Sequence, residues 1–181
     1  MINDFLSKID LQKINFKRIG KNVLISKRAI FYNPSAVEIS NDVRIDAYSV
    51  FQNSNSLVIG KNSHISCHVF FCGCEEIILE GSNGIGPYVS IYSSINKFSS
   101  KKVDYLYKKN PNKIKILKNR VILEKFSIVG DKSTIFPGVI LRRGSAIASN
   151  SKVTISTLPW KIYGHYNNNN IVEIIGKRKN D

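Results

Sequence analysis

Three histidines are the residues of this chain best suited to proton transfer, because the pKa of an imidazole lies at about 6.5, close to neutrality. They are His64, His68 and His165. A neutral imidazole can act as a general base that deprotonates an attacking hydroxyl or amine. His64 is our first candidate for such a base and His68 the second. His165, next to Tyr166 and a run of asparagines, is interpreted as a surface residue.

The three cysteines, Cys67, Cys72 and Cys74, are odd in number and close together, which argues against a disulfide framework. A single residue separates Cys72 from Cys74, whereas two residues separate the cysteines of common zinc-binding pairs, and the sequence has no second cysteine pair. We therefore expect no metal site and interpret these cysteines as small residues of the core.

The chain is strongly basic, with 27 Lys and Arg against 13 Asp and Glu and a formal charge of +14. This balance favours an anionic partner such as a phosphorylated cofactor, a nucleotide or an acidic polysaccharide. A solvated lysine-rich surface is the alternative. Nucleic-acid binding would need aromatic residues interleaved with the cations, and in the most basic segment only Tyr105 and Tyr107 qualify, so we expect no nucleic-acid partner.

No stretch approaches the roughly 20 apolar residues of a membrane-spanning helix. The first residues also lack the long apolar segment of a signal peptide. The sequence therefore predicts a cytoplasmic protein without a membrane span.

An apolar residue recurs every six positions along most of the chain. In four blocks of twenty residues that begin at position 19, apolar residues stand at offsets of zero, six and twelve, and from 123 to 153 the spacing is six throughout. These positions are Ile19, Ile25, Phe31, Ile39, Ile45, Phe51, Ile59, Ile65, Phe71, Leu79, Ile85, Ile91, Leu123, Val129, Ile135, Leu141, Ile147 and Val153. A small or β-branched residue usually follows four positions later, as Ser133 follows Val129.

A period of six matches neither an α-helix nor a long strand. It matches a short strand followed by a sharp corner, three strands to a turn, with each apolar residue stacked on its counterpart roughly 4.8 Å away in the next coil. The predicted fold class is β, a left-handed parallel β-helix. We expect an N-terminal cap at 1–18, the β-helix at 19–156 with an inserted loop at 93–120, and a C-terminal tail at 157–181.

The inserted loop carries nine cations and a single acid, Asp104. Long excursions from a regular solenoid are usually functional or disordered. The loop is therefore either a binding segment for an acceptor that carries phosphates or carboxylates, or a solvated loop.

Several segments resemble the hexapeptide-repeat acetyltransferases. These segments are Phe136-Pro137-Gly138-Val139, Val153-Thr154, Leu158-Pro159-Trp160, Ile162-Tyr163-Gly164 and Ile174-Ile175-Gly176-Lys177-Arg178. Upstream, His64-Ile65-Ser66, Gly84-Ile85-Gly86 and Ser90-Ile91-Tyr92-Ser93-Ser94 resemble a branch that acetylates sugars of surface polysaccharides, including nucleotide-linked aminodeoxysugars.

The resemblance implies an acetyl-CoA-dependent sugar acetyltransferase, with acetyl-CoA as co-substrate and a sugar or nucleotide-sugar as acceptor. It also implies a homotrimer with active sites between subunits. Positions that match the family's cofactor site are Asp131, Ser149, Thr154, Lys177 and Arg178. Arg142 and Arg143 are further candidates for the cofactor's phosphates.

The position that holds the catalytic histidine in many family members falls near Asn96, and an amide is no general base at neutral pH. We expect Asn96 to orient the acceptor. His64 matches a histidine of the branch, and we expect its side chain to point outward close to the loop that leaves at 93–96. Glu75 and Glu76 either orient a histidine or are solvated. The alternative to an enzyme is a non-catalytic β-helix that binds a polyanion.

Overall fold

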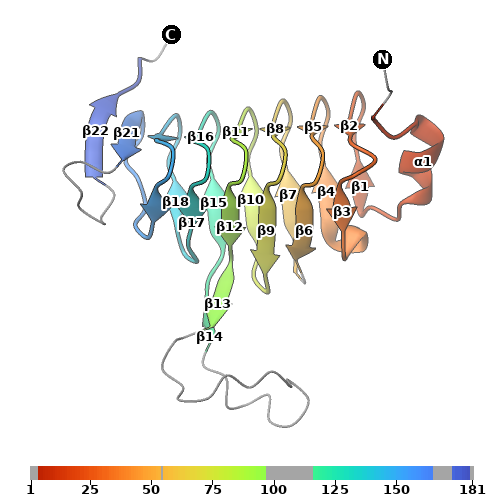
Figure 1. Ribbon diagram of the computed structural model, residues 1–181, viewed down its shortest axis with the longest axis horizontal. Helices are drawn as coiled ribbons and strands as arrows, with labels where there is room; N and C mark the ends of the chain where they lie inside the picture. The colour runs from red at the N-terminus through yellow and green to blue at the C-terminus, as the bar shows by residue number, and fades with distance from the viewer. Residues whose placement is uncertain (1–3, 54, 97–115, 165–172, 180–181) are drawn as a thin grey trace.

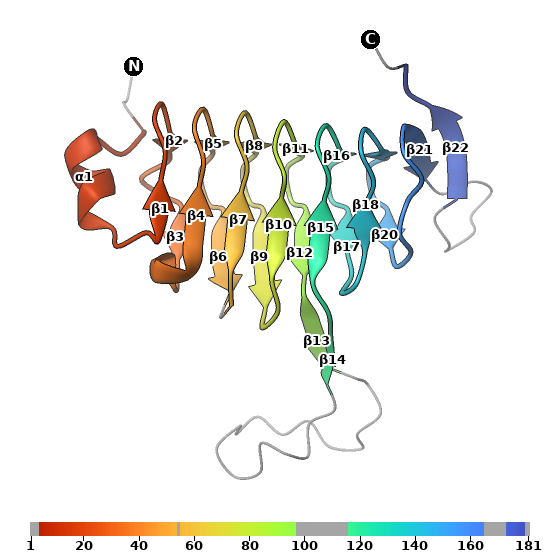
Figure 2. The same cartoon turned by 180° about the vertical axis from the view of Figure 1, so that it is seen from behind.

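The computed structural model describes residues 4–53, 55–96, 116–164 and 173–179. It confirms the predicted β-helix: short strands form a three-sided solenoid of stacked coils (Figure 1; Figure 2 from behind). Each coil contributes one strand to each of three sheets, so most strands pair with strands about twenty residues away along the chain, and the pairs that span the inserted loop are 44 residues apart.

The first sheet is parallel and has the order β1-β4-β7-β10-β15-β18. Its strands are β1 (Arg18–Ile19), β4 (Val37–Ile39), β7 (Leu57–Ile59), β10 (Ile77–Leu79), β15 (Val121–Leu123) and β18 (Ile140–Leu141). The second sheet contains β2 (Leu24–Ile25), β5 (Arg44–Ile45), β8 (His64–Ile65), β11 (Gly84–Ile85), β16 (Ile128–Val129), β19 (Ala146–Ile147), β21 (Lys161–Gly164) and β22 (Glu173–Lys177).

The third sheet contains β3 (Ile30–Phe31), β6 (Val50–Asn53), β9 (Phe70–Gly73), β12 (Ser90–Tyr92), β17 (Thr134–Ile135) and β20 (Lys152–Val153). We call the edge between the first and second sheets the first corner, that between the second and third sheets the second corner, and that between the third and first sheets the third corner. A short 3-10 helix, η1 (Pro34–Ala36), lies in the third corner of the first coil.

The predicted inward positions form the core. Sixteen of the eighteen are buried with no more than 3% of their surface exposed, and the remaining two, Ile19 and Phe31 of the first coil, are partly buried against the same core. Phe31, Phe51 and Phe71 stack face to face at centroid separations of 4.4 and 5.1 Å. The six-residue period therefore reports the stacking of one coil on the next.

The small residues four positions later close the corners, as predicted. Ser133 is fully buried, and its hydroxyl donates a hydrogen bond of 3.0 Å to the carbonyl of Ala148. The turns themselves use left-handed backbone conformations, for example at Asn62 (φ 58°) in the first corner and His68 (φ 58°) in the second. Such a φ is uncommon outside glycine and fixes where these side chains project.

The two ends of the solenoid are covered differently. Helix α1 (Lys8–Lys13) begins with a capping box between Ser7 and Asp10, and Leu6, Leu11 and Phe16 of the N-terminal segment pack against the core. At the other end β21 pairs in parallel with β19, so the coil continues to Gly164, and β22 runs back antiparallel along β21. The boundaries 1–18, 19–156 and 157–181 stay a prediction.

The predicted loop at 93–120 leaves the solenoid at the third corner as a hairpin. Its base is formed by β13 (Ser94–Asn96) and β14 (Ile116–Lys118), which pair antiparallel with Asn96 opposite Ile116. Residues 97–115, including Asp104, Tyr105 and Tyr107, lie outside the described residues.

Candidate functional site

A cavity of about 780 Å³ lies at the third corner, where the strands of the third sheet end beside the hairpin. The last residues of β6, β9 and β12 and the residues that follow β3 lie around it, and the hairpin forms one wall with Asn96 and Ile116. The blocks of twenty residues supply this site, because their two extra residues fall at the third corner.

Among the described residues the lining of this cavity is uncharged, and it combines several polar groups with a larger apolar part. It presents the amides of Asn33, Gln52, Asn53 and Asn96 together with the aromatic side chains of Tyr32 and Tyr92, the hydroxyl of Ser94 and the thiols of Cys72 and Cys74. Amides and aromatic rings suit a neutral ligand with many donors and acceptors, such as a sugar or a nucleobase. The cavity can therefore hold the neutral parts of a nucleotide sugar.

Asn53 is the most deeply buried of the lining amides, at 3% exposure. Its Nδ2 donates to the carbonyl of Glu75 at 3.5 Å, while its Oδ1 accepts no hydrogen bond from the described residues. A buried acceptor without a donor is costly, so the site has a place for a donor that a ligand or a water supplies.

The cysteines are free thiols and half-buried, in line with their interpretation as small packing residues. Burial, together with the neighbouring Cys74, raises the pKa of the Cys72 thiol. Because the thiolate is the nucleophilic form, a raised pKa disfavours Cys72 as an acyl carrier.

His64 forms a dyad with Asp46 on the second sheet. Nε2 of His64 lies 2.7 Å from Oδ2 of Asp46, and Nε of Arg44 donates to Oδ1 of the same carboxylate at 2.8 Å. A carboxylate only accepts hydrogen bonds, so Nε2 is the donor and the neutral ring has its free electron pair on Nδ1. No described residue hydrogen-bonds to Nδ1, and half of the side chain is exposed.

The carboxylate of this dyad is held in its ionised form. Burial opposes the ionisation of Asp46, but hydrogen bonds from His64 and Arg44 outweigh it and place the pKa of Asp46 below its usual range. Sequence analysis missed Asp46 and considered Glu75 and Glu76 instead. Glu75 forms an ion pair with Lys118 at 3.1 Å, at the base of the hairpin.

His64 and Asn96 do not meet within one chain, which corrects the expected proximity of His64 to the loop. Strand β8 belongs to the second sheet, which is the side of the triangular coil opposite the third corner, whereas the hairpin leaves from that corner (Figures 1 and 2). The physical reason is the coil itself, since three strands complete a full turn and a change of strand is a change of side.

His68 lies in the second corner, exposed and sandwiched between Tyr48 and Tyr88. The ring centroids are 5.0 and 4.7 Å apart. Both faces of the imidazole are thus covered, so only its edge is free to meet a ligand. His165 lies outside the described residues.

The residues that match the family's cofactor site lie at different corners. Asp131 and Ser149 are exposed in the second corner of neighbouring coils, and Thr154 is exposed at the third corner. Lys177 and Arg178 lie near the end of the tail, beside the first corner. The structure thus brings Asp131 and Ser149 together and separates them from the others.

Arg178 also has a structural role. Its guanidinium donates to the carbonyls of Phe126 (2.7 Å) and Gly144 (3.0 Å) and lies 5.8 Å from the centroid of the Trp160 ring. These contacts tie the tail to the first corner. The remaining N–H groups of its guanidinium are the ones that could reach a ligand.

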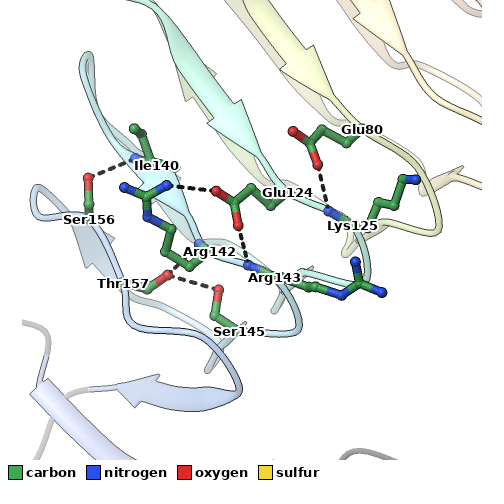
Figure 3. Close-up of polar contacts among 9 residues, drawn as sticks. All are labelled: Glu80, Glu124, Lys125, Ile140, Arg142, Arg143, Ser145, Ser156 and Thr157. Atoms are coloured by element: carbon green, nitrogen blue, oxygen red, sulfur yellow. Dashed lines mark hydrogen bonds and ion pairs between the residues drawn. The ribbon is translucent and has the colours of Figure 1, made fainter.

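The arginine pair 142–143 is engaged in the same way (Figure 3). The carboxylate of Glu124 accepts a hydrogen bond of 2.8 Å from Nη1 of Arg142 and one of 2.7 Å from the backbone N–H of Arg143. The Arg143 guanidinium itself lies over the Phe126 ring at 5.1 Å. These cations therefore stabilise the stacking of the C-terminal coils.

Comparison with known proteins shows the family to which the chain belongs. No protein-family model matches it. A curated relative from Escherichia coli, dTDP-4-amino-4,6-dideoxy-D-glucose acyltransferase, is 33% identical over 154 residues, which is 82% of this chain and 78% of the relative.

In the described part of the chain, no helix is long and apolar enough to cross a membrane.

Solved structures of AntD, an N-acyltransferase from Bacillus cereus, match almost the whole chain. A serine-to-alanine mutant in complex with dTDP-4-amino-4,6-dideoxyglucose and coenzyme A is 34% identical, with a TM-score of 0.89 over 99% of this chain and 93% of AntD. The complex with dTDP and 3-hydroxybutyryl-CoA is also 34% identical, with a TM-score of 0.86 over 98% and 92%. A hexapeptide-repeat acetyltransferase from Vibrio cholerae O1 biovar eltor, at 17% identity and a TM-score of 0.62, shares the fold.

The six-residue repeat, the solenoid and the hairpin at its third corner define a hexapeptide-repeat acyltransferase. More narrowly, the chain belongs to the family of the dTDP-4-amino-4,6-dideoxyglucose acyltransferases.

Proposed function

We propose that this enzyme transfers the acyl group of an acyl-CoA to the amino group of a dTDP-linked aminodeoxysugar. The observation that carries the proposal is the match over 98–99% of the chain, at TM-scores of 0.86 to 0.89, to AntD in complex with dTDP or its amino sugar and with coenzyme A or its thioester. The uncharged cavity beside Asn96 supports it, because its amides and rings suit a sugar or a base.

In the proposed reaction the amine nitrogen attacks the carbonyl carbon of the thioester. The new C–N bond forms as the C–S bond breaks, and the proton lost by the amine passes to Nδ1 of His64 and then to the departing thiolate. The products are the amide and free coenzyme A. Asp46 holds the imidazole in the tautomer that leaves Nδ1 free.

A homotrimer would complete this site. His64 and the cavity lie on opposite sides of one prism, so a single chain cannot use both on one substrate. We propose that three copies associate so that the His64 side of one faces the cavity of the next. Acetyl-CoA is the proposed donor, and Asp131, Ser149, Thr154, Lys177 and Arg178, supplied by neighbouring subunits, are the proposed contacts. The cytoplasm, where nucleotide sugars and acyl-CoA are made, is the proposed location.

Thiol release from acetyl-CoA and 3-hydroxybutyryl-CoA, with dTDP-4-amino-4,6-dideoxyglucose as acceptor, tests the proposal. Release that depends on the acceptor, and that falls by about 10²–10⁴ in His64→Ala, supports acyl transfer with His64 as base. His68→Ala is the matched control, because His68 is equally exposed but stacked between tyrosines.

Each part of the proposal can fail separately. Release that persists in His64→Ala would refute His64 as the base but would leave the acyltransferase activity established. Release from 3-hydroxybutyryl-CoA but not from acetyl-CoA would show that the donor is the hydroxybutyryl thioester. For Asn96→Ala we expect a rise of about fivefold in the KM for the sugar with an unchanged KM for acyl-CoA, because one lost hydrogen bond costs about 1 kcal/mol. Light scattering that shows a monomer would refute the trimer.

A further inference from the structure

A second hollow lies at the first corner of the N-terminal coils. Its volume is about 660 Å³, and it is bounded by the ends of β1, β4, β7 and β10 and by the corner residues that follow them. Gly20, Ser40 and Gly60 occupy the first position after β1, β4 and β7. At Gly20 and Gly60 the next coil fills the place of a Cβ, so the coils stack closely here and the trough runs along their outer edge.

Three lysines line the trough at equal intervals. Lys21, Lys61 and Lys125 each lie two residues after the last inward residue of a first-sheet strand, and all three are exposed. Asn41 and Gly81 hold the same position in the coils between them. With a coil rise of roughly 4.8 Å, successive lysines are roughly 10 Å apart along the axis, within reach of one another's ligand through their flexible side chains.

The charges of these lysines are uncompensated. Glu38 pairs with Lys17 (2.9 Å) and Arg18 (3.1 Å), so its carboxylate offsets one of the two positive charges at the first end of the trough. The ammonium groups of the three lysines have no ion pair among the residues the structure describes. Glu80 is the one acid in the lining, and its Oε2 accepts the backbone N–H of Lys125 at 3.3 Å (Figure 3).

We infer that this trough binds phosphate groups of a nucleotide used in the reaction, through Lys21, Lys61 and Lys125. The inference rests on the proposed function. Among the residues that the structure describes, the lining of the cavity beside Asn96 has no charged side chain to neutralise a diphosphate. The phosphates come from either of two sources, the nucleoside diphosphate of the acceptor or the phosphorylated adenosine end of coenzyme A.

Calorimetric titration of the full chain with dTDP and, separately, with coenzyme A tests the site and distinguishes the two sources. The variant carries Lys21→Gln, Lys61→Gln and Lys125→Gln, which keep a polar side chain only one atom shorter and remove its charge. A control carries Lys8→Gln, Lys13→Gln and Lys132→Gln, which remove the same three charges elsewhere on the surface. Circular dichroism and light scattering verify that both variants fold and assemble as the wild type does.

We expect the trough variant to bind one of the two ligands at least tenfold more weakly, and the control to bind within about twofold of wild type. The wild type should also lose affinity more steeply with salt than the trough variant does. Weaker binding of dTDP assigns the trough to the acceptor, and weaker binding of coenzyme A assigns it to the donor. If the trough variant binds both ligands as tightly as the wild type does, and still turns over, the phosphate site at the trough is refuted while the proposed function stands. A wild type without binding or turnover refutes the proposed function as well.

Discussion

Nε2 of His64 lies 2.7 Å from Oδ2 of Asp46, although eighteen residues separate the two in the chain. The coil explains this proximity, because β5 and β8 pair with Arg44 opposite His64 and Asp46 follows two positions later. Arg44 holds the other carboxylate oxygen at 2.8 Å, so the position of Asp46 is fixed from both sides. The result is an imidazole with a defined tautomer on an exposed side of the solenoid.

Replacing Asp46 by asparagine tests this arrangement. The amide can donate to Nε2, which would move the proton of the imidazole to Nδ1 and remove its free electron pair. We expect kcat to fall about a hundredfold with little change in KM, because the general base is lost while the substrate contacts remain. Steady-state kinetics across pH 5.5–9 measures both effects.

A double-mutant comparison is the control for that prediction. In a His64→Ala background, Asp46→Asn should change kcat by less than about twofold, because Asp46 acts only through the imidazole. A hundredfold loss in that background would mean that Asp46 supports the structure or the substrate directly, and the positioning role would be wrong.

The sequence predicted the core and the main repeat because each inward residue obeys one local rule, an apolar side chain every six residues. The dyad was within reach of the same rule, since aligning the coils places positions 44, 46 and 64 together on one side, but only the apolar and the small positions of the coils were compared. The cavity was not within reach. Its shape depends on the backbone path of the extra residues at the third corner, such as Asn53 and Cys74, which the six-residue period does not specify.

Phe51→Ala should destabilise the solenoid strongly. Phe51 is 1% exposed and stacked between Phe31 and Phe71 at 4.4 and 5.1 Å, so the truncation leaves a cavity between two rings. We expect a loss of about 3–5 kcal/mol in the free energy of unfolding, measured by urea denaturation. Ile30→Ala, whose side chain is half-exposed on the same sheet, should cost less than about 1 kcal/mol. Equal losses for the two variants would contradict the inward stack.

Two glycines make a matched pair for backbone and packing constraints. Gly144 has φ 67°, and an added Cβ would overlap the ring of Trp160, so Gly144→Ala should destabilise the C-terminal coils by more than about 1 kcal/mol. At Gly84 the nearest atoms to an added Cβ are Ile128 methyl and methylene carbons, at 3.8 and 3.9 Å. Gly84→Ala should therefore leave the midpoint of thermal unfolding within about 2 °C of wild type. A fall of many degrees in the unfolding midpoint of Gly84→Ala would show that the space beside His64 is filled in the assembled enzyme.

Glu124 links stability to pH at the first corner. Burial opposes its ionisation, but hydrogen bonds from the Arg142 side chain and the Arg143 backbone N–H outweigh burial and lower the pKa of Glu124. A folded-state pKa below the unfolded value of about 4.3 means that the stabilisation is present above pH 4.3 and lost as the pH falls through the folded-state pKa.

Glu124→Gln should therefore be less stable than wild type by on the order of 1 kcal/mol at pH 7, because the pair is partly exposed, and the difference should shrink towards zero in acid. Urea denaturation at pH 7, 5 and 3.5 measures it. Glu76→Gln is the control, since no described residue forms an ion pair with Glu76, and it should match wild type at every pH. A loss in Glu124→Gln that stays constant down to pH 3.5 would mean that the shape of the side chain, and not its charge, holds the coils together.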